Sequence, residues 1–165
     1  VYINTLQSKQ ATVDKIFDKV DVDVSTITEF AHIKDRKSTL NEFINANAEL
    51  MDTRKNAEAI LTEELNKRAV SQKSIDAYIK GYRDGQTEQH ALLLKIDVTN
   101  TQSMEVWLSI MDLLESKGGV WEPYPENFSI QTEDEELIEK FNKLLERTDS
   151  IANEQAKYIE ELQSQ

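Results

Sequence analysis

The sequence predicts an all-α protein, an elongated antiparallel helical bundle of three to four helices, two of them longer than about 40 residues. Three observations predict this class. The 165 residues include only 4 glycines and 2 prolines, whereas a sheet protein relies on both at its turns. Charged residues make up 30 % of the chain, as expected of a thin bundle with much surface around little core. Apolar residues recur every three to four positions over long stretches, so residues 1–165 are interpreted as one helical domain.

The first two helices are predicted from apolar stripes separated by a short interruption. The first covers about 2–19. Alternating Asp and Val residues over 21–24 disfavour helix, and Ser25 or Thr26 is expected to cap the element that follows. The second helix is predicted over about 27–69, where the apolar period is near 3.5, the period of helices packed at a shallow angle, as in a coiled coil.

The third helix is predicted over about 72–117, after a tight reversal in which Ser71 is the N-cap. Gly81 and Gly85 each lower helix propensity by roughly 1 kcal/mol relative to Ala. The apolar register nevertheless continues past both glycines, so a single continuous helix, bent along its length, is the favoured interpretation.

Gly118 and Gly119 are expected to end that helix and to start the one long loop, 118–132, which holds both prolines. Thr132 is predicted to be the N-cap of a last helix over about 133–163, since acidic residues follow it and complement the positive helix terminus.

The loop carries the candidate partner-binding residues Trp121, Tyr124 and Phe128. Two interpretations stay open. The loop is a plug that closes one end of the bundle, or it is a binding tip, because exposed aromatic side chains beside rigid prolines make good anchors for a protein partner.

A second candidate feature is a polar core layer in the third helix, formed by Gln86, Gln89, Asn100 and Ser103. In a symmetric hairpin these positions face Lys37, Asn47 and Arg54 of the second helix. The layer would fix the helix register, as buried polar residues do in coiled coils, or line a cavity for a small molecule. A third interpretation is that these stretches are exposed where the shorter helices do not cover them.

The formal net charge of −12 disfavours nucleic-acid partners and charge-driven docking on anionic lipids. The chain has no cysteine, which excludes disulfides and thiolate metal sites, and no apolar run long enough to span a bilayer. Glu29 and His32 have the Glu-x-x-His spacing of di-metal bundles, but the chain lacks the second such pair that those sites need. We expect no metal, no cofactor and no enzymatic activity, because no nucleophile motif or phosphate loop occurs.

Three segments in the last third of the chain resemble the YiaF-like family of uncharacterised bacterial envelope lipoproteins. They are Trp107–Gly119, the Phe-Ser-Ile-Gln-Thr run that ends at Thr132, and the Glu-Lys-Phe-Asn-Lys-Leu run that ends at Leu144. The resemblance implies attachment through an upstream lipidated cysteine, which this chain does not contain, and it implies no activity and no functional residue.

The leading functional hypothesis is a non-enzymatic, extracytoplasmic binding or scaffolding protein of the bacterial cell envelope. Its partner is expected to be a protein, and it would meet the membrane only through an anchor that this chain lacks, since the first residue is Val1 and not Met. The alternative is a periplasmic or extracellular ligand-sensing helical bundle of a membrane receptor. A cytosolic helical adaptor is the third hypothesis.

Overall fold

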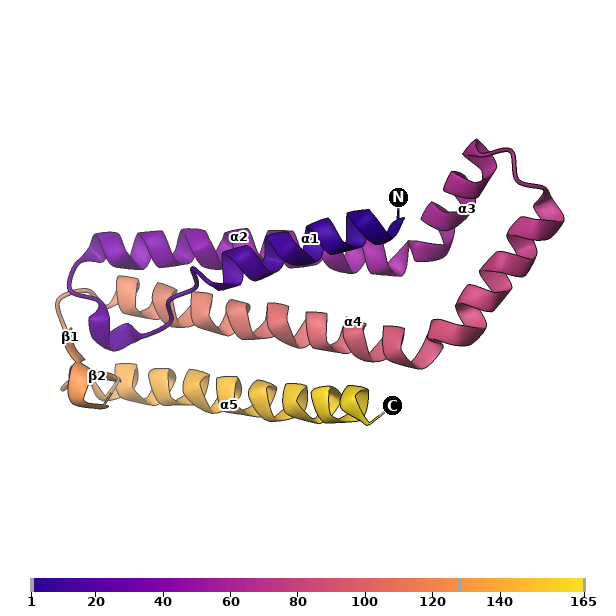
Figure 1. The fold of residues 1–165 in the computed structure, drawn as a ribbon. Helices are drawn as coiled ribbons and strands as arrows, with labels where there is room; N and C mark the ends of the chain where they lie inside the picture. The colour runs from indigo at the N-terminus through magenta and orange to yellow at the C-terminus, as the bar shows by residue number, and fades with distance from the viewer. Residues whose placement is uncertain (1, 128, 165) are drawn as a thin grey trace.

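The computed structural model is mostly helical and elongated (Figure 1), and it describes residues 2–127 and 129–164, apart from the side chains of Gln86 and Thr87. Its α-helices are α1 (Tyr2–Phe17), α2 (Phe30–Lys55), α3 (Ala57–Lys67), α4 (Gln72–Ser116) and α5 (Glu135–Gln163). Shorter elements are the 3₁₀ turns η1 (Val24–Thr26) and η2 (Pro125–Asn127) and the strands β1 (Trp121–Tyr124) and β2 (Ser129–Thr132). The all-α class predicted from the sequence is confirmed.

Helix α4 is the central element, because it packs against α2 on one side and α5 on the other, and α1 lies along α2 (Figure 1). Consecutive long helices run antiparallel, as short connections require. The main core lies between these helices and contains, among others, Leu40, Phe43, Leu50, Val106, Ile110, Met111, Leu114 and Leu137. Because α4 packs against α2 and α5 on two sides, it buries a wider part of its surface than a helix with one apolar face.

The prediction of one long second helix over 27–69 is wrong, because the chain forms α2 and α3 with a break at Asn56. The Asn56 amide donates to the Asp52 carbonyl (3.0 Å) and the Asp52 carboxylate (2.8 Å). Such side-chain bonds to the backbone compete with the hydrogen bonds of the helix, which favours the end of α2 at this position. Among the described helices only α4, with 45 residues, is longer than 40.

The prediction of a continuous, bent third helix is confirmed. Ser71 is its N-cap, and the Ser71 side chain accepts a hydrogen bond from the Ser74 N–H. The first part of α4 turns away from the bundle together with α3 (Figure 1). This arm has a small core of its own around Tyr2, Ala57 and Leu61, which brings the start of α1 against α3.

The turn between α1 and α2 differs in its capping from the prediction. Neither Ser25 nor Thr26 caps α2, because the N-cap of α2 is Glu29, which makes no side-chain cap hydrogen bond. Asp23 instead caps the turn η1, where its side chain accepts from the Ser25 N–H. The Arg36 guanidinium fixes this turn from α2, donating to the Asp23 carbonyl (2.6 Å) and to the Asp21 carboxylate (2.5 Å). These bonds from Arg36 hold the turn against α2.

Candidate functional site

The region predicted as a long loop, 118–132, is instead a short antiparallel hairpin at one end of the bundle. Trp121 pairs with Thr132 and Tyr124 with Ser129 in its register. Gly119 starts the hairpin with a φ of 85°, a left-handed conformation in which an L side chain is strained. The Thr132 hydroxyl donates to the Val120 carbonyl (2.5 Å) and closes the base of the hairpin.

Because Thr132 belongs to β2, the prediction that it caps the last helix is wrong. Asp134 is the N-cap of α5, and its side chain accepts from the Leu137 N–H at 2.9 Å. The Lys117 ammonium, 2.9 Å from Asp134 and 3.3 Å from Glu136, joins the end of α4 to the start of α5. The bond from Lys117 lowers the pKa of the Asp134 carboxyl, and the bonds to Asp134 and Glu136 raise the pKa of the Lys117 amine.

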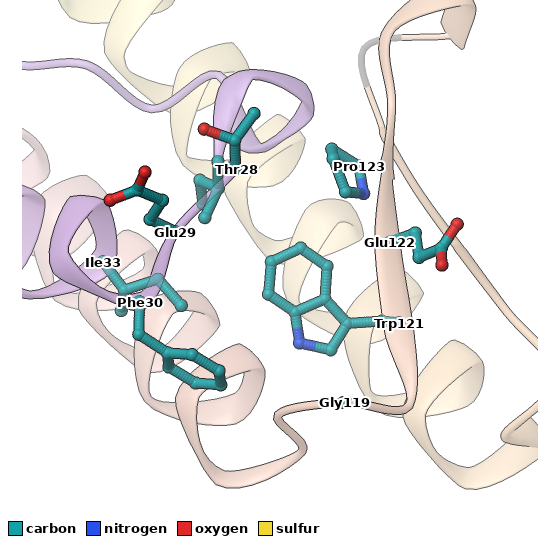
Figure 2. A pocket seen from close by; sticks show the side chains of 9 residues that line it. Thr28, Glu29, Phe30, Ile33, Gly119, Trp121, Glu122 and Pro123 are labelled. Carbon is teal, nitrogen blue, oxygen red and sulfur yellow. The ribbon is translucent and has the colours of Figure 1, made fainter.

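Trp121 is the residue that joins the hairpin to the helices. Its indole N–H donates to the Leu114 carbonyl at 2.8 Å, a carbonyl in the last turn of α4. Figure 2 shows the indole ring projecting from β1 towards the start of α2, while the neighbouring Glu122 side chain points to the other side of the strand. The ring is half-buried, so one part of it packs on the core and another part stays accessible.

The accessible part of Trp121 forms a wall of a cavity of about 210 Å³. The other walls come from the start of α2 and from the hairpin: Ile27, Thr28, Glu29, Phe30, Ile33, Gly119, Glu122 and Pro123 (Figure 2). Phe30 is 56 % exposed, and its ring lies directly against Gly118, where an added Cβ atom would be 2.0 Å from the Phe30 Cζ. The lack of a side chain at position 118 is therefore what lets the Phe30 ring form the rim.

The surroundings of this cavity are acidic. Glu29 and Glu122 lie on its rim, and both are exposed. Glu133 and Asp134 line a neighbouring hollow that shares Trp121 and Glu122 with this cavity. The Asp134 carboxylate is paired with Lys117. An apolar cavity with carboxylates at its edge suits a ligand that has an apolar group next to a positive charge.

The predicted binding residues of the loop are partly brought together. Trp121 lines the cavity, and Tyr124 is half-buried at the far end of β1 and is not among the residues that line it. Phe128 lies outside the described residues. Sequence reasoning missed Phe30 and Ile27, which come from a segment almost a hundred residues earlier in the chain.

The predicted polar core layer does not form as predicted. Gln89 is exposed, Ser103 is half-buried, and the half-buried Asn100 accepts a hydrogen bond from the Gln155 amide of α5 at 2.5 Å. The Gln86 side chain lies outside the described residues. The prediction assumed a symmetric hairpin, and the break at Asn56 together with the bend of α4 changes which positions face each other.

A buried polar layer does exist, at Asp97, about one helical turn before the predicted Asn100. The Asn47 amide, fully buried, donates to the Asp97 carbonyl (2.6 Å) and to the Thr101 hydroxyl (2.9 Å). The Arg54 Nε lies 2.9 Å from the Asp97 carboxylate, with side chains 8 % and 7 % exposed. Burial raises the pKa of the Asp97 carboxyl, and the positive charge of Arg54 opposes this effect. The sequence predicts that Asn47 and Arg54 face the third helix. It does not identify Asp97 as their partner, because no pattern around Asp97 distinguishes it from the exposed acidic residues of the chain.

A second cavity, of about 340 Å³, lies where α2 passes into α3. Its walls include the cationic side chains of Arg54, Lys55 and Arg83, and also Tyr82 and His90. The Arg83 guanidinium is paired with the Glu58 carboxylate at 2.6 Å. Burial lowers the pKa of the His90 imidazole, and the positive charge of Arg54 lowers it further.

Over the part of the chain that the structure describes, no group of three or more His, Cys, Asp or Glu side chains is placed to hold a metal ion. Within the same residues, no helix has the length and apolar character needed to cross a membrane. Comparison with known proteins finds no match among family models, curated proteins or solved structures.

Proposed function

We propose that this chain is a non-catalytic binding or scaffolding protein, and that the cavity beside the hairpin holds one apolar side chain of a protein partner. The observation that carries this proposal is the position of Trp121, whose indole is fixed to the Leu114 carbonyl and yet walls an open cavity. An aromatic wall that is already ordered loses little side-chain entropy on binding, which favours its use as an anchor.

The chemistry of the rim supports a basic partner segment. Glu29 and Glu122 are the charged residues that line the cavity, and the chain as a whole carries a net charge of −12. A peptide with an aliphatic or aromatic residue next to Lys or Arg would place the apolar group against Trp121 and Phe30 and the cation near the carboxylates. Charge complementarity of this kind raises the association rate and disfavours acidic competitors.

Selection from a random peptide library displayed on phage, with the whole protein immobilised, tests this proposal. We expect enriched peptides to contain an apolar residue flanked by Lys or Arg, and Phe30→Ala to weaken their binding at least about tenfold. Phe30→Ala is the informative variant because Phe30 is exposed, whereas Trp121→Ala also removes packing and a hydrogen bond. Tyr78→Ala, at an equally exposed residue of α4, is the matched control. Peptides that bind the Phe30→Ala and wild-type proteins equally would contradict the proposal.

The location of the protein in the cell envelope, attached through a lipid anchor, is part of the same proposal, and it rests on the resemblance described above. The coding sequence upstream of Val1 tests it directly. A cysteine in a lipidation signal would support the proposal, whereas transmembrane segments on both flanks would favour a receptor domain.

The second candidate function, a ligand-sensing bundle, is favoured by the cavity at the α2–α3 junction. The exposed Lys55 ammonium, beside the buried Arg54, would place a small carboxylate or phosphate compound against positive charge. Thermal-shift titration with citrate and with inorganic phosphate, against chloride at equal ionic strength, tests it. We expect stabilisation that is lost in Lys55→Gln, and an equal response of the two proteins would exclude this site.

A further inference from the structure

One face of the α4–α5 pair is uncovered among the described residues. It forms an open groove of about 710 Å³ between the two helices. Helix α5 lies at the edge of the bundle, against α4, and α1 lies on α2 at the other edge (Figure 1). The groove is lined by Ser109, Asp112, Leu113 and Ser116 of α4 and by Lys140, Lys143, Leu144 and Arg147 of α5.

The positive charges of this groove are unusual in so acidic a chain. Lys140, Lys143 and Arg147 follow one another at spacings of three and four, so they share one face of α5. Lys140 is paired with Glu136 at 2.6 Å, whereas Lys143 and Arg147 have no ion-pair partner within the described part of the chain. Like charges four residues apart repel each other, which makes this stripe unfavourable until negative charge approaches it.

The same face of α5 carries the opposite charge in its second half. Glu154 follows Arg147 by seven residues, which is about two helical turns, and Glu161 follows Glu154 by seven more. Tyr158 lies between them, donates to the Glu154 carboxylate (2.5 Å), and has the Lys95 ammonium of α4 5.0 Å from its ring centroid. Glu154 and Glu161 are exposed.

We propose that this face binds a second copy of the chain, with the two α5 helices antiparallel. In that arrangement the two-fold axis passes between Ser150 and Ile151. Arg147 then lies opposite Glu154 of the second copy, Lys140 opposite Glu161, and Lys143 opposite Tyr158. The charge pattern of the helix is therefore complementary to itself when one copy is reversed.

The geometry of the helices supports such an interface. A two-fold axis makes every contact occur twice, so two charge pairs in the sequence become four in the dimer. Ser150 at the axis and Ser109 and Ser116 along α4 are short side chains, which let the second helix approach closely. Leu113 and Leu144, half-buried at the floor of the groove, and Val98, 41 % exposed at the position on α4 that continues the face, supply apolar contact.

Sedimentation velocity of the whole protein at concentrations from about 10 μM to 1 mM tests the proposal, at low salt and again at about 0.5 M salt, where charge pairs are screened. We expect a reversible dimer whose Kd rises with salt. Arg147→Glu and Glu154→Arg should each raise the Kd at least about tenfold, because they place like charges opposite each other. The double variant R147E/E154R restores opposite charges across the axis and should return the Kd to within about threefold of the wild-type value.

Two control variants make the same changes of net charge elsewhere. Lys73→Glu lies at the start of α4, and Glu160→Arg lies about 120° around α5 from Glu154. Both should leave the dimer unchanged.

A cross-link gives an independent readout, because the chain has no cysteine. Ser150→Cys should form an intermolecular disulfide under mild oxidation, while Ser8→Cys on α1 should not. A wild-type protein that is monomeric throughout this concentration range would overturn the proposal. A dimer that is insensitive to both charge reversals would also overturn it. If a single reversal unfolds the chain, the double variant and the cross-link decide.

Discussion

The buried ion pair between Arg54 and Asp97 leads to a prediction with a defined magnitude. Both side chains are less than one-tenth exposed, and their closest approach is 2.9 Å. Removal of one partner leaves the other charge buried without compensation, which costs about 3–5 kcal/mol. We therefore expect Asp97→Asn to cost less than this, because burial already disfavours the charged form of the Asp97 carboxyl, and Arg54→Met to lower the free energy of unfolding by the full amount. At about 2–4 °C per kcal/mol for a chain of this size, the melting temperature of Arg54→Met should fall by roughly 6–20 °C.

The double variant separates the pair from its surroundings. If the two charges compensate each other, R54M/D97N should cost less than the two single variants together, with a coupling energy of about 0.5–3 kcal/mol. Urea unfolding followed by far-ultraviolet circular dichroism measures the free energy of unfolding of the wild type, of the two single variants and of the double variant. Glu58→Gln, which breaks the exposed pair with Arg83, is the control and should leave the unfolding midpoint unchanged. Strictly additive losses from the two single variants would refute the reasoning.

The pH dependence of stability gives the same pair a second test. Burial raises the pKa of Asp97 in the folded protein above its ordinary value of 3.8. Between the unfolded and folded pKa values the native state holds more protons than the unfolded state, so the free energy of unfolding falls as pH rises through that window. This contribution is fully present below the unfolded pKa, and it should be missing from the pH profile of Asp97→Asn.

Three further predictions follow from the hairpin and from the helix ends. Gly118→Ala should cost less than about 1 kcal/mol, because its Cβ meets the tip of the Phe30 ring, which is exposed and can swing away, and Phe30→Ala in the same chain should remove that loss, as measured by urea unfolding. Ser71→Ala removes the cap of α4 and should cost about 0.5–2 kcal/mol by the same measurement; an unchanged midpoint would mean that the cap contributes nothing. The bond between Lys117 and Asp134 lowers the pKa of Asp134 and raises that of Lys117. Its stabilisation should therefore be lost as pH falls through the folded pKa of Asp134, below 3.8, and as pH rises through that of Lys117, above 10.5. Lys117→Gln should weaken the fall of the melting temperature at both the acidic and the alkaline end of its pH profile. An unchanged pH profile would contradict the stabilising role of this ion pair.

The helices themselves could be predicted because their signals are local. The apolar register over 72–117 held past Gly81 and Gly85, and the structure has one continuous helix there. Ser71 was identified as a cap because a cap depends on residues only three positions away. The break at Asn56 was missed, since the apolar period continues through it and an asparagine within a helix has no distinct pattern.

In the candidate site, too, the sequence identifies a residue from its neighbours in the chain but not the distant residues that surround it in the fold. Trp121 was identified because aromatic residues beside prolines stand out in a polar chain, but its environment could not be predicted. Phe30 and Ile27 reach the cavity only because the start of α2 and the end of α4 meet at one end of the bundle. Gly118 matters because the Phe30 ring lies on it, a contact between residues far apart in the chain.

The sequence by itself determined the helical class, the continuity of α4, its N-cap, and the acidic character of the surface, because backbone propensity and side-chain spacing act within a few residues. The tertiary structure decided that the expected loop is a hairpin, that Asp97 rather than Asn100 or Ser103 forms the buried layer with Asn47 and Arg54, and that the cavity exists. Those outcomes depend on which helix faces meet, and the bend of α4 and the break at Asn56 set that pairing through packing between distant segments.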